Sequence, residues 1–245
     1  MLNVNKVIQN HRSVRNFVDK DIPQDMLDSI LLSAQAMPSS NNNQDITIIV
    51  IKDKLRKDII AELSGNQKHI KEAPVFLIFL ADLYKTSLAC EKNNIEQNLE
   101  NPLDKIVTAT FDAGIAMGSA IISAESLGLG VTPIGGIRNN LERISKILEL
   151  PEYVFPLVGL CLGFPYNIPN KKPRFPLPAF KHDEVYKKEA IESYINEYDE
   201  IMQNYLIKIK REQEVNWSYN VAKSMSKKSD DSLEKLFVNQ KIIKI

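Results

Sequence analysis

Two clusters of cationic residues are the features of this sequence best suited to chemistry. His11-Arg12-Ser13-Val14-Arg15 places two arginines, a hydroxyl and an imidazole within five residues. Lys171-Lys172-Pro173-Arg174 lies far downstream, among prolines that prevent a helix. Arginine presents a planar fork of donors that matches phosphate oxygens, and it stays charged at physiological pH. The two clusters could therefore converge on one anion, although each alone could equally be a solvated surface or the partner of a carboxylate.

The composition limits the partners of these clusters. Of 245 residues, 44% are hydrophobic and 25% are charged, a balance typical of globular proteins. Lysine plus arginine and aspartate plus glutamate each number 31, so the whole chain has no net attraction for nucleic acid or for an anionic membrane. The basic clusters must act locally, and we expect no nucleic acid and no membrane among the partners.

The sequence shows no signal for export, for membrane insertion or for a metal centre. The first six residues lack an apolar signal core, and the apolar runs at 75–81 and 155–162 are too short to span a bilayer. We therefore expect a cytoplasmic protein. Cys90 and Cys161 form no CxxC pair, and no histidine or cysteine spacing suits a metal, so neither a disulfide framework nor structural zinc is predicted.

The hydrophobic pattern predicts helices and strands in alternation. Helices are expected at 23–38, at 53–63, at 103–127, from about 139, and again after 188. Buried strands are expected at 46–51, 75–81, 131–134 and 155–163, with Cys161 as a buried residue of the last. Such an order is typical of a mixed α/β or α+β sheet surrounded by helices.

The helix expected at 103–127 is rich in alanine, glycine and serine. Small side chains permit close approach of a backbone, either to a flat ligand or to another helix, and a tightly packed central helix explains them equally well. No linker divides the chain, so we expect a single domain over residues 1–245. A polar, helical excursion is expected at 84–101 and a C-terminal helical extension at 188–245.

Common nucleotide and hydrolase fingerprints do not occur in the chain. There is no GxGxxG after the first strand, no GxxxxGK[ST] and no GxSxG. A Rossmann dehydrogenase, a P-loop ATPase and an α/β hydrolase are therefore poorly supported.

Seven short motifs occur in one order along the chain. They are His-Arg-Ser-x-Arg-x-Phe from residue 11, Pro-Ser-Ser-x-x-x-Gln from 38, Gly-x-Gln-Lys-His from 65, Ala-Glu-Ser-Leu-Gly-Leu-Gly from 124, Ile-Gly-Gly-Ile-Arg-Asn-Asn from 134, Gly-Leu-Cys-Leu-Gly-Phe-Pro from 159 and Lys-Pro-Arg from 172. In this order they closely resemble the FMN-dependent nitroreductase family, in the branch of the oxygen-insensitive NADPH nitroreductases and NADPH-flavin oxidoreductases. The resemblance extends from about His11 to Trp217.

The resemblance implies a fold, a cofactor and an activity. The fold would be α+β, with a central, mainly antiparallel sheet flanked by helices, assembled as an intertwined homodimer with FMN at the interface. The activity would be that of an enzyme passing two electrons from NADPH or NADH through bound FMN, in a ping-pong exchange. Nitroaromatics, quinones, free flavin or disulfides could be the acceptors, and the sequence does not choose among them.

The resemblance also implies how the cationic clusters act. Arg12, Lys172 and Arg174 would surround the FMN phosphate, and Ser13 would bind phosphate or ribityl hydroxyls. His11 would orient this segment and donate to the flavin or the phosphate.

Arg15 is the one residue to which the resemblance gives a catalytic role. It would lie at the pyrimidine edge of the flavin, where its fixed charge stabilises negative charge at N1 and O2. This role is electrostatic, and no acid–base side chain or metal is expected.

Further cofactor contacts would come from loops. A loop contributed across the dimer interface would supply Ser39, Ser40 and Gln44, and Gln67 would bind the N3/O4 edge of the ring. Near N5 the ring would lie against Ile134, Gly135 and Gly136, where glycine permits close backbone approach.

The substrate-facing residues depart from the family pattern. Asn41 and Asn42 stand where well-known relatives have phenylalanine, which predicts a more polar wall for the substrate. The loop expected to bind the 2′-phosphate of NADPH keeps Lys208, Lys210 and Arg211 but adds two glutamates, so the preference for NADPH over NADH stays open.

Two other classes of function remain as alternatives. A flavin-binding carrier or sensor would hold FMN with little turnover. A nucleic-acid-binding module is disfavoured by the zero net charge.

Overall fold

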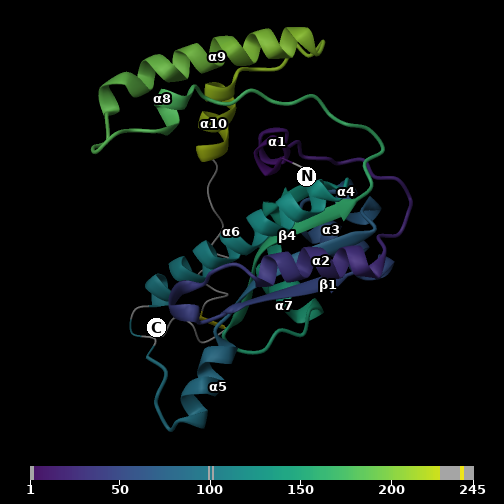
Figure 1. Cartoon of the computed structure of the whole chain (residues 1–245), viewed down its shortest axis with the longest axis vertical. Helices are drawn as coiled ribbons and strands as arrows, with labels where there is room; N and C mark the ends of the chain where they lie inside the picture. The colour runs from purple at the N-terminus through teal and green to yellow at the C-terminus, as the bar shows by residue number, and fades with distance from the viewer. Residues whose placement is uncertain (1–2, 99, 101, 227–237, 240–245) are drawn as a thin grey trace. The chain divides into compact units, whose positions relative to one another are not determined.

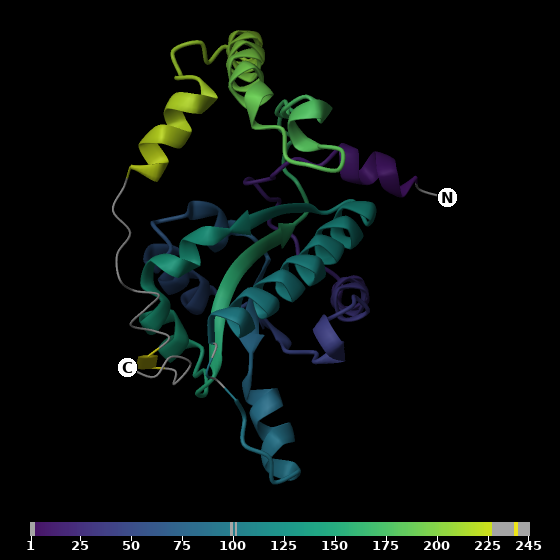
Figure 2. The same ribbon diagram turned by 90° about the vertical axis from the view of Figure 1, so that its left-hand side faces the viewer.

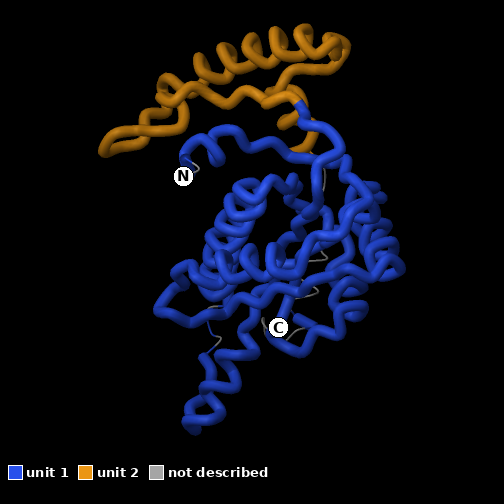
Figure 3. The backbone as a smooth tube through the Cα atoms, turned by 45° about the vertical axis from the view of Figure 1, so that its right-hand side comes forward, with its two compact units in different colours: residues 1–169, 231–245 blue, residues 170–230 orange. Residues whose placement is uncertain are grey.

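In the computed structural model, which describes residues 3–98, 100, 102–226 and 238–239, the chain forms two compact units. The first comprises Met1–Pro169 with Asp231–Ile245, and the second comprises Asn170–Asp230 (Figure 3). Compactness does not establish that a unit folds alone, so the expectation of one domain over residues 1–245 stays a prediction. Part of the expected C-terminal extension, residues 227–237 and 240–245, lies outside the described residues.

A four-stranded sheet forms the centre of the first unit (Figure 1). Its strands are β1 (Ile46–Ile51), β2 (Val75–Asp82), β3 (Gly130–Ile134) and β4 (Val154–Gly163). The spatial order is β1-β2-β4-β3, and all three pairings are antiparallel. All four strands lie where the hydrophobic pattern predicts them, and the α+β class is confirmed.

Strand β2 explains why helices must cover both faces of the sheet. Every residue of this strand is buried, because successive side chains point to opposite faces and all are apolar except the last. Val75, Leu77 and Phe79 pack on one side with residues of α2 and α6. The alternate residues pack on the other side with residues of α3, α4 and α7. The first unit therefore has helices, sheet and helices as three layers, and Figure 2 shows α6 lying along the sheet.

The helices of the first unit include those predicted at 23–38, at 53–63, at 103–127 and from about 139, each within a few residues of its expected range. They are α1 (Val4–Gln9), α2 (Gln24–Gln35), η1 (Ser40–Asn42), α3 (Lys54–Leu63), α4 (Lys68–Glu72), α5 (Tyr84–Lys92), α6 (Pro102–Ser126), η2 (Gly135–Asn140) and α7 (Leu141–Ile147). Helix α4 was not predicted, because five residues are too few to show a helical period. Helix α5 occupies the first half of the polar segment expected at 84–101.

The prediction that 46–51 is a buried strand is wrong in one respect. The strand forms as expected, but only Ile51 is buried, because β1 lies at the edge of the sheet. A run of β-branched residues reports strand propensity and does not distinguish an edge strand from a central one.

Helix α6 packs closely on the core through small residues. Five alanines (Ala109, Ala113, Ala116, Ala120 and Ala124) and Asp112 are its buried residues. By length and mean hydropathy α6 is the one described helix that would suit a membrane span, a test that core helices of soluble proteins also pass. Its alanine face against the sheet and α2 is the packing of a core helix.

The second unit is helical and is centred on three aromatic rings. It contains α8 (Leu177–Phe180), η3 (Lys188–Ala190), α9 (Ile191–Lys208) and α10 (Trp217–Met225). The ring of Phe175 stacks on Tyr198 at 4.2 Å and meets Trp217 edge-on at 4.8 Å. Asp199 accepts a 2.9 Å hydrogen bond from the backbone N–H of Ser218 and so joins α9 to the start of α10.

Gly159 in β4 should tolerate no side chain. A Cβ there would lie 2.3 Å from Cζ of Phe76, which is fully buried and cannot move aside. Gly159→Ala should lower the free energy of unfolding by about 1–3 kcal/mol, measured by urea denaturation with circular dichroism. An unchanged midpoint would contradict the packing of β2 against β4.

Candidate functional site

The N-terminal cationic segment lies against β3. Ser13 forms an isolated bridge with Val131, and the N–H of Val14 donates to the Val131 carbonyl at 2.9 Å. The hydroxyl of Thr132 donates to the carbonyl of Val14. Strand β3 continues into the turn Ile134-Gly135-Gly136, so this sheet edge carries both the segment and the predicted glycine turn.

The extended segment presents its side chains to opposite sides in alternation. Val14 is buried, and it fills the space beside Gly130, where an added Cβ would lie 2.7 Å from it. Arg12 and Val14 line one cavity of about 340 Å³, together with residues of α1 and the C-terminal end of α6. By the same alternation Ser13 and Arg15 share the other side, whereas the His11 side chain contacts Glu125, which lines the same cavity as Arg12. The predicted phosphate ligand Arg12 thus lies on a different side of the segment from Ser13 and Arg15.

His11 is held from α6. Its Nδ1 lies 2.7 Å from Oε1 of Glu125, in the last turn of that helix. The sequence analysis gave Glu125 no role, although it lies within one of the seven motifs.

Gln67 and Gly136 are in close contact. Gln67 precedes α4, and its Nε2 donates to the Ser64 carbonyl at 3.0 Å. A Cβ on Gly136 would lie 2.4 Å from that Nε2, so only glycine leaves room for the amide. The Ile134 side chain is buried, which leaves the backbone of this turn to face a ligand. The structure thus brings together Gln67 and the turn at 134–136, as predicted from the resemblance.

Arg15 lies near α4 as well. Burial, and then the charge of Arg15, lower the pKa of His69, the second residue of that helix. His69 was missed in the sequence analysis as a candidate; the signal was its place two residues after Gln67 in the same motif. The exposed guanidinium of Arg15 makes no ion pair with any of the described residues.

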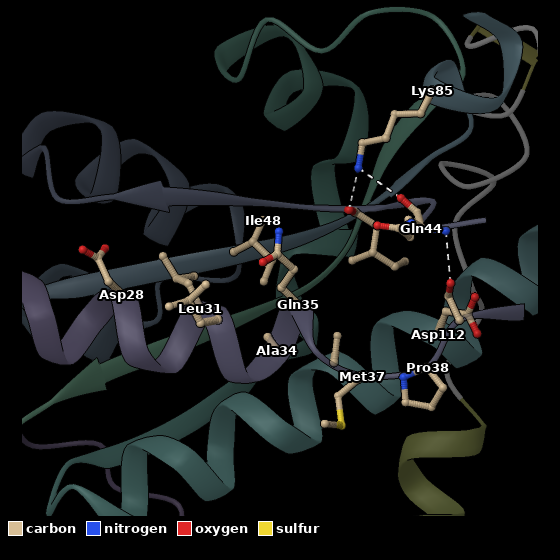
Figure 4. A pocket seen from close by; sticks show the side chains of 14 residues that line it. Asp28, Leu31, Ala34, Gln35, Met37, Pro38, Gln44, Ile48, Lys85 and Asp112 are labelled. Carbon is tan, nitrogen blue, oxygen red and sulfur yellow. Dashed lines mark hydrogen bonds between the residues drawn. The ribbon is translucent and has the colours of Figure 1, made fainter. Parts of the chain in front are cut away.

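The loop that carries Ser39, Ser40 and Gln44 is anchored to Asp112 of α6 and not to the N-terminal segment (Figure 4). The N–H of Ser40 donates to Oδ2 of Asp112 at 2.9 Å, and the N–H of Gln44 donates to Oγ of Ser39 at 3.1 Å. Asn41, Asn42 and Gln44 have φ between +50° and +57°. Asparagine tolerates this left-handed conformation better than most residues, which gives the asparagines a backbone role beside the predicted polar wall.

Helix α6 separates the two groups of predicted residues. Asp112 holds the loop at residues 39–44, and Glu125 holds His11. These two acids are thirteen residues apart on one helix, a separation of about 20 Å at 1.5 Å per residue. Within one chain the structure does not place Ser39, Ser40 and Gln44 beside the segment at 11–15.

The remaining predicted residues lie in the second unit. Arg174 donates to the carbonyls of Lys172 and Pro173 at 3.2 and 3.1 Å, and the hydroxyl of Tyr198 donates to Pro173 at 3.0 Å. Tyr198 therefore contacts the Lys-Pro-Arg segment through this hydrogen bond while its ring stacks on Phe175.

The basic residues at the end of α9 and after it are constrained by the backbone and by an ion pair. Lys208 ends α9, Lys210 has a φ of +59°, and Arg211 forms an ion pair with Glu214 through both Nε and NH2. One of the two glutamates noted in this loop is thus a direct partner of Arg211. That Lys172, Arg174, Lys208, Lys210 and Arg211 contact a cofactor or nucleotide stays a prediction.

Two buried carboxyl groups lie beneath the loop at residues 39–44. Asp45 and Asp112 are 2% and 3% exposed. Burial, and next the charge of Asp112, raise the pKa of Asp45, while its own backbone and Lys85 act in the opposite direction. The ammonium of Lys85 donates to the carbonyls of Gln44 and Ile46 at 3.1 and 2.8 Å (Figure 4). A cavity of about 600 Å³ opens beside this cluster.

Two protein-family models match most of the chain. Residues 8–164 match the nitroreductase family, and residues 172–244 match the nitroreductase family, C-terminal domain. The chain belongs to the nitroreductase family. It is 43% identical over 225 residues to a Bacillus subtilis (strain 168) protein named FMN reductase (NAD(P)H), covering 91% of this chain and 90% of that protein.

Two further proteins are similar to this chain over nearly their whole length. The oxygen-insensitive NADPH nitroreductase of Salmonella typhimurium is 32% identical, covering 89% of each chain. The solved structure of B. megaterium NfrA2 superposes with a TM-score of 0.95 at 39% identity, covering 98% of each chain. The resemblance inferred from the seven motifs is confirmed, and so is the nitroreductase fold.

Asp45→Asn should stabilise the protein at neutral pH. Because the pKa of Asp45 is raised in the folded state, its protonated carboxyl adds to the free energy of unfolding at low pH. This contribution is fully present below about pH 3.8 and is lost as pH rises through the folded-state pKa. Asparagine keeps a donor toward Asp112 at every pH, so the gain should be on the order of 1 kcal/mol at pH 7 and vanish in acid. Thermal unfolding at several pH values measures it. Asp28→Asn, an exposed acid lining the same cavity, is the matched control. A gain that persists below pH 4 would contradict the assignment.

Proposed function

We propose that this nitroreductase-family protein is an FMN-dependent NAD(P)H oxidoreductase. Its family supports this, and so do the names of the two relatives given above, an FMN reductase and an NADPH nitroreductase. The observation that carries the proposal is a single sheet edge on which an arginine without an ion-pair partner among the described residues, a carboxamide and a glycine turn come together.

The residues of this edge fit FMN. A phosphate and an electron-accepting ring require cations and N–H donors that are not already bound to carboxylates. Arg15 meets this requirement among the described residues, and the hydroxyl of Ser13 lies on the same side. Because Gly136 carries no Cβ, Gln67 can pack against the turn whose backbone would face the ring. The donor set therefore suits a flat, anionic cofactor.

We assign the cofactor contacts as follows. The phosphate and ribityl chain would be held from the N-terminal segment by His11 and Ser13, whereas Arg12 faces the other side of that segment. That Lys172 and Arg174 also bind the phosphate is a prediction that rests on the resemblance alone. The ring would be held by Arg15, Gln67, Ile134, Gly135 and Gly136.

The chemistry then follows from what these residues do. When bound, FMN supplies two-electron redox chemistry, taking a hydride from a reduced nicotinamide and passing the electron pair to an acceptor in a ping-pong exchange. Arg15 adds a fixed positive charge at the pyrimidine edge, and the turn at 134–136 adds backbone N–H donors. No side chain need act as nucleophile or general base. Nitroaromatics, quinones, free flavin and disulfides are the proposed acceptors.

A homodimer would complete this site. Leu103, Val107 and Phe111 form an apolar stripe on α6 and are 60–67% exposed, and Gly114 and Gly118 continue it with open space around them. Their spacing of three and four residues puts them on one helix face. A second copy packed on this face would cover it, and its loop at residues 39–44 could reach the first copy's flavin.

Arg15→Ala should lower the midpoint potential of bound FMN. Removing a fixed cation destabilises the negative charge gained on reduction, so NADPH oxidation should slow roughly tenfold to a hundredfold even at saturating FMN. A redox titration and stopped-flow kinetics with a quinone acceptor measure both effects. Arg56→Ala removes an exposed arginine from α3 and should change neither the midpoint potential nor the rate of NADPH oxidation.

Two results would count against the proposal. A protein that binds no FMN would overturn the assignment, and one that holds FMN without turnover would favour the carrier or sensor. An unchanged potential in Arg15→Ala would show that this arginine does not face the ring.

Phe111→Asp should separate the two subunits. The wild type should scatter light as twice the 27.8 kDa chain, and the variant as one chain, because a carboxylate cannot be buried unpaired in an apolar interface. The variant should also bind FMN more weakly, since the partner's loop is lost. Leu55→Asp, at an equally exposed residue of α3, should remain dimeric. A wild type that is monomeric and fully loaded with FMN would contradict the dimer and leave the cofactor assignment intact.

A further inference from the structure

Glu125 occupies a position that electrostatics alone disfavours. It lies in the last turn of α6, where the helix dipole presents its negative end and where α6 has no basic residue. Its side chain is only 13% exposed. A buried carboxylate at a helix C-terminus requires a compensating partner.

That partner is His11, at 2.7 Å between Oε1 and Nδ1. An ionised carboxylate only accepts hydrogen bonds, so Nδ1 must carry the hydrogen. This contact fixes the tautomer and the orientation of the ring, and it leaves Nε2 directed away from α6.

Arg12 faces the same cavity as this carboxyl group. Arg12 and Glu125 both line the cavity of about 340 Å³. Nε of Arg12 and Oε2 of Glu125 are both buried, and neither has a hydrogen-bond partner among the described residues. Opposite charges facing one small cavity attract, so Glu125 also favours the conformation in which Arg12 points inward.

We propose that Glu125 is the positioning residue of the cofactor site. It holds His11 by Nδ1 and draws Arg12 inward, and so keeps the segment extended with Ser13 and Arg15 on the side opposite Arg12. The inference rests on the proposed function, in which that side binds FMN. Glu125 itself touches no reacting group.

Two substitutions distinguish contact geometry from charge. Glu125→Asp keeps the charge but withdraws the carboxylate by one methylene, so it breaks the contact with Nδ1. Glu125→Gln loses the charge but keeps a carbonyl oxygen at the position of Oε1. A merely electrostatic or structural role predicts that the aspartate variant is the milder one, and the proposal predicts the reverse order.

The first measurement is FMN affinity of the full chain, by titration of flavin fluorescence. Glu125→Asp should raise the dissociation constant roughly tenfold, whereas Glu125→Gln should stay within about threefold of the wild type. In a His11→Ala background Glu125→Asp should raise the dissociation constant much less, because the contact between His11 and Glu125 is already lost. Glu142→Gln removes an exposed acid paired with Lys146 on α7 and is the control for charge.

The second measurement does not depend on FMN. The chain has three histidines, so the ¹⁵N shifts of the His11 imidazole can be assigned with a His11→Ala variant. At about pH 8.5, where imidazole is normally neutral, the wild type and Glu125→Gln should show the hydrogen on Nδ1. Glu125→Asp should show a mixture of tautomers.

The outcomes separate the two proposals. If the wild type does not bind FMN but His11 carries its hydrogen on Nδ1, the proposed function fails and the contact stands. If FMN binds and Glu125→Asp binds it as tightly as the wild type, the positioning role is overturned. Equal losses from Glu125→Asp in the His11→Ala and wild-type backgrounds would overturn it as well, because they would show that Glu125 does not act through His11.

Discussion

The close packing of α6 on the sheet is the contact on which the rest of the molecule depends. Its alanines bring the helix axis near the strands, and a larger side chain at any of these buried positions would push it away. Because α6 is one continuous helix of 25 residues, it fixes the distance between the two acids that anchor segments of the proposed site. Asp112 sets the position of the loop at residues 39–44, and Glu125 sets the position of His11. One helix thus positions two segments that are proposed to bind FMN.

Much of this architecture could be predicted from the sequence, because it depends on local pattern. The four strands and the long helix follow from apolar runs and their boundaries, and the order of seven motifs indicated the family. The partial exposure of β1 could not be predicted, since a strand's place in the sheet depends on long-range pairing. Helix α4 was missed because it is too short to show a period.

The sequence indicated which residues belong to the candidate site, but it did not indicate which way their side chains point. The resemblance assigned Gln67 and the glycine turn to different edges of one flavin ring, and the structure brings the two into contact with each other. It could not predict which side of the segment Arg12 faces, because that is decided by the bridge between Ser13 and Val131, more than a hundred residues apart. Glu125 was hidden for the same reason: an acid near the end of a helix has no recognisable role until its partner from the N-terminus is known.

The burial of Cys161 in β4 limits the reactivity of its thiol. Its side chain is fully enclosed, and burial raises the pKa of the thiol far above its ordinary value, although Lys57 acts in the opposite direction. Only a thiolate attacks electrophiles and disulfides at a useful rate. Quinones form adducts with accessible thiolates, and disulfides exchange with them. The sheet thus shields this sulfur from the very reagents that the protein is proposed to reduce.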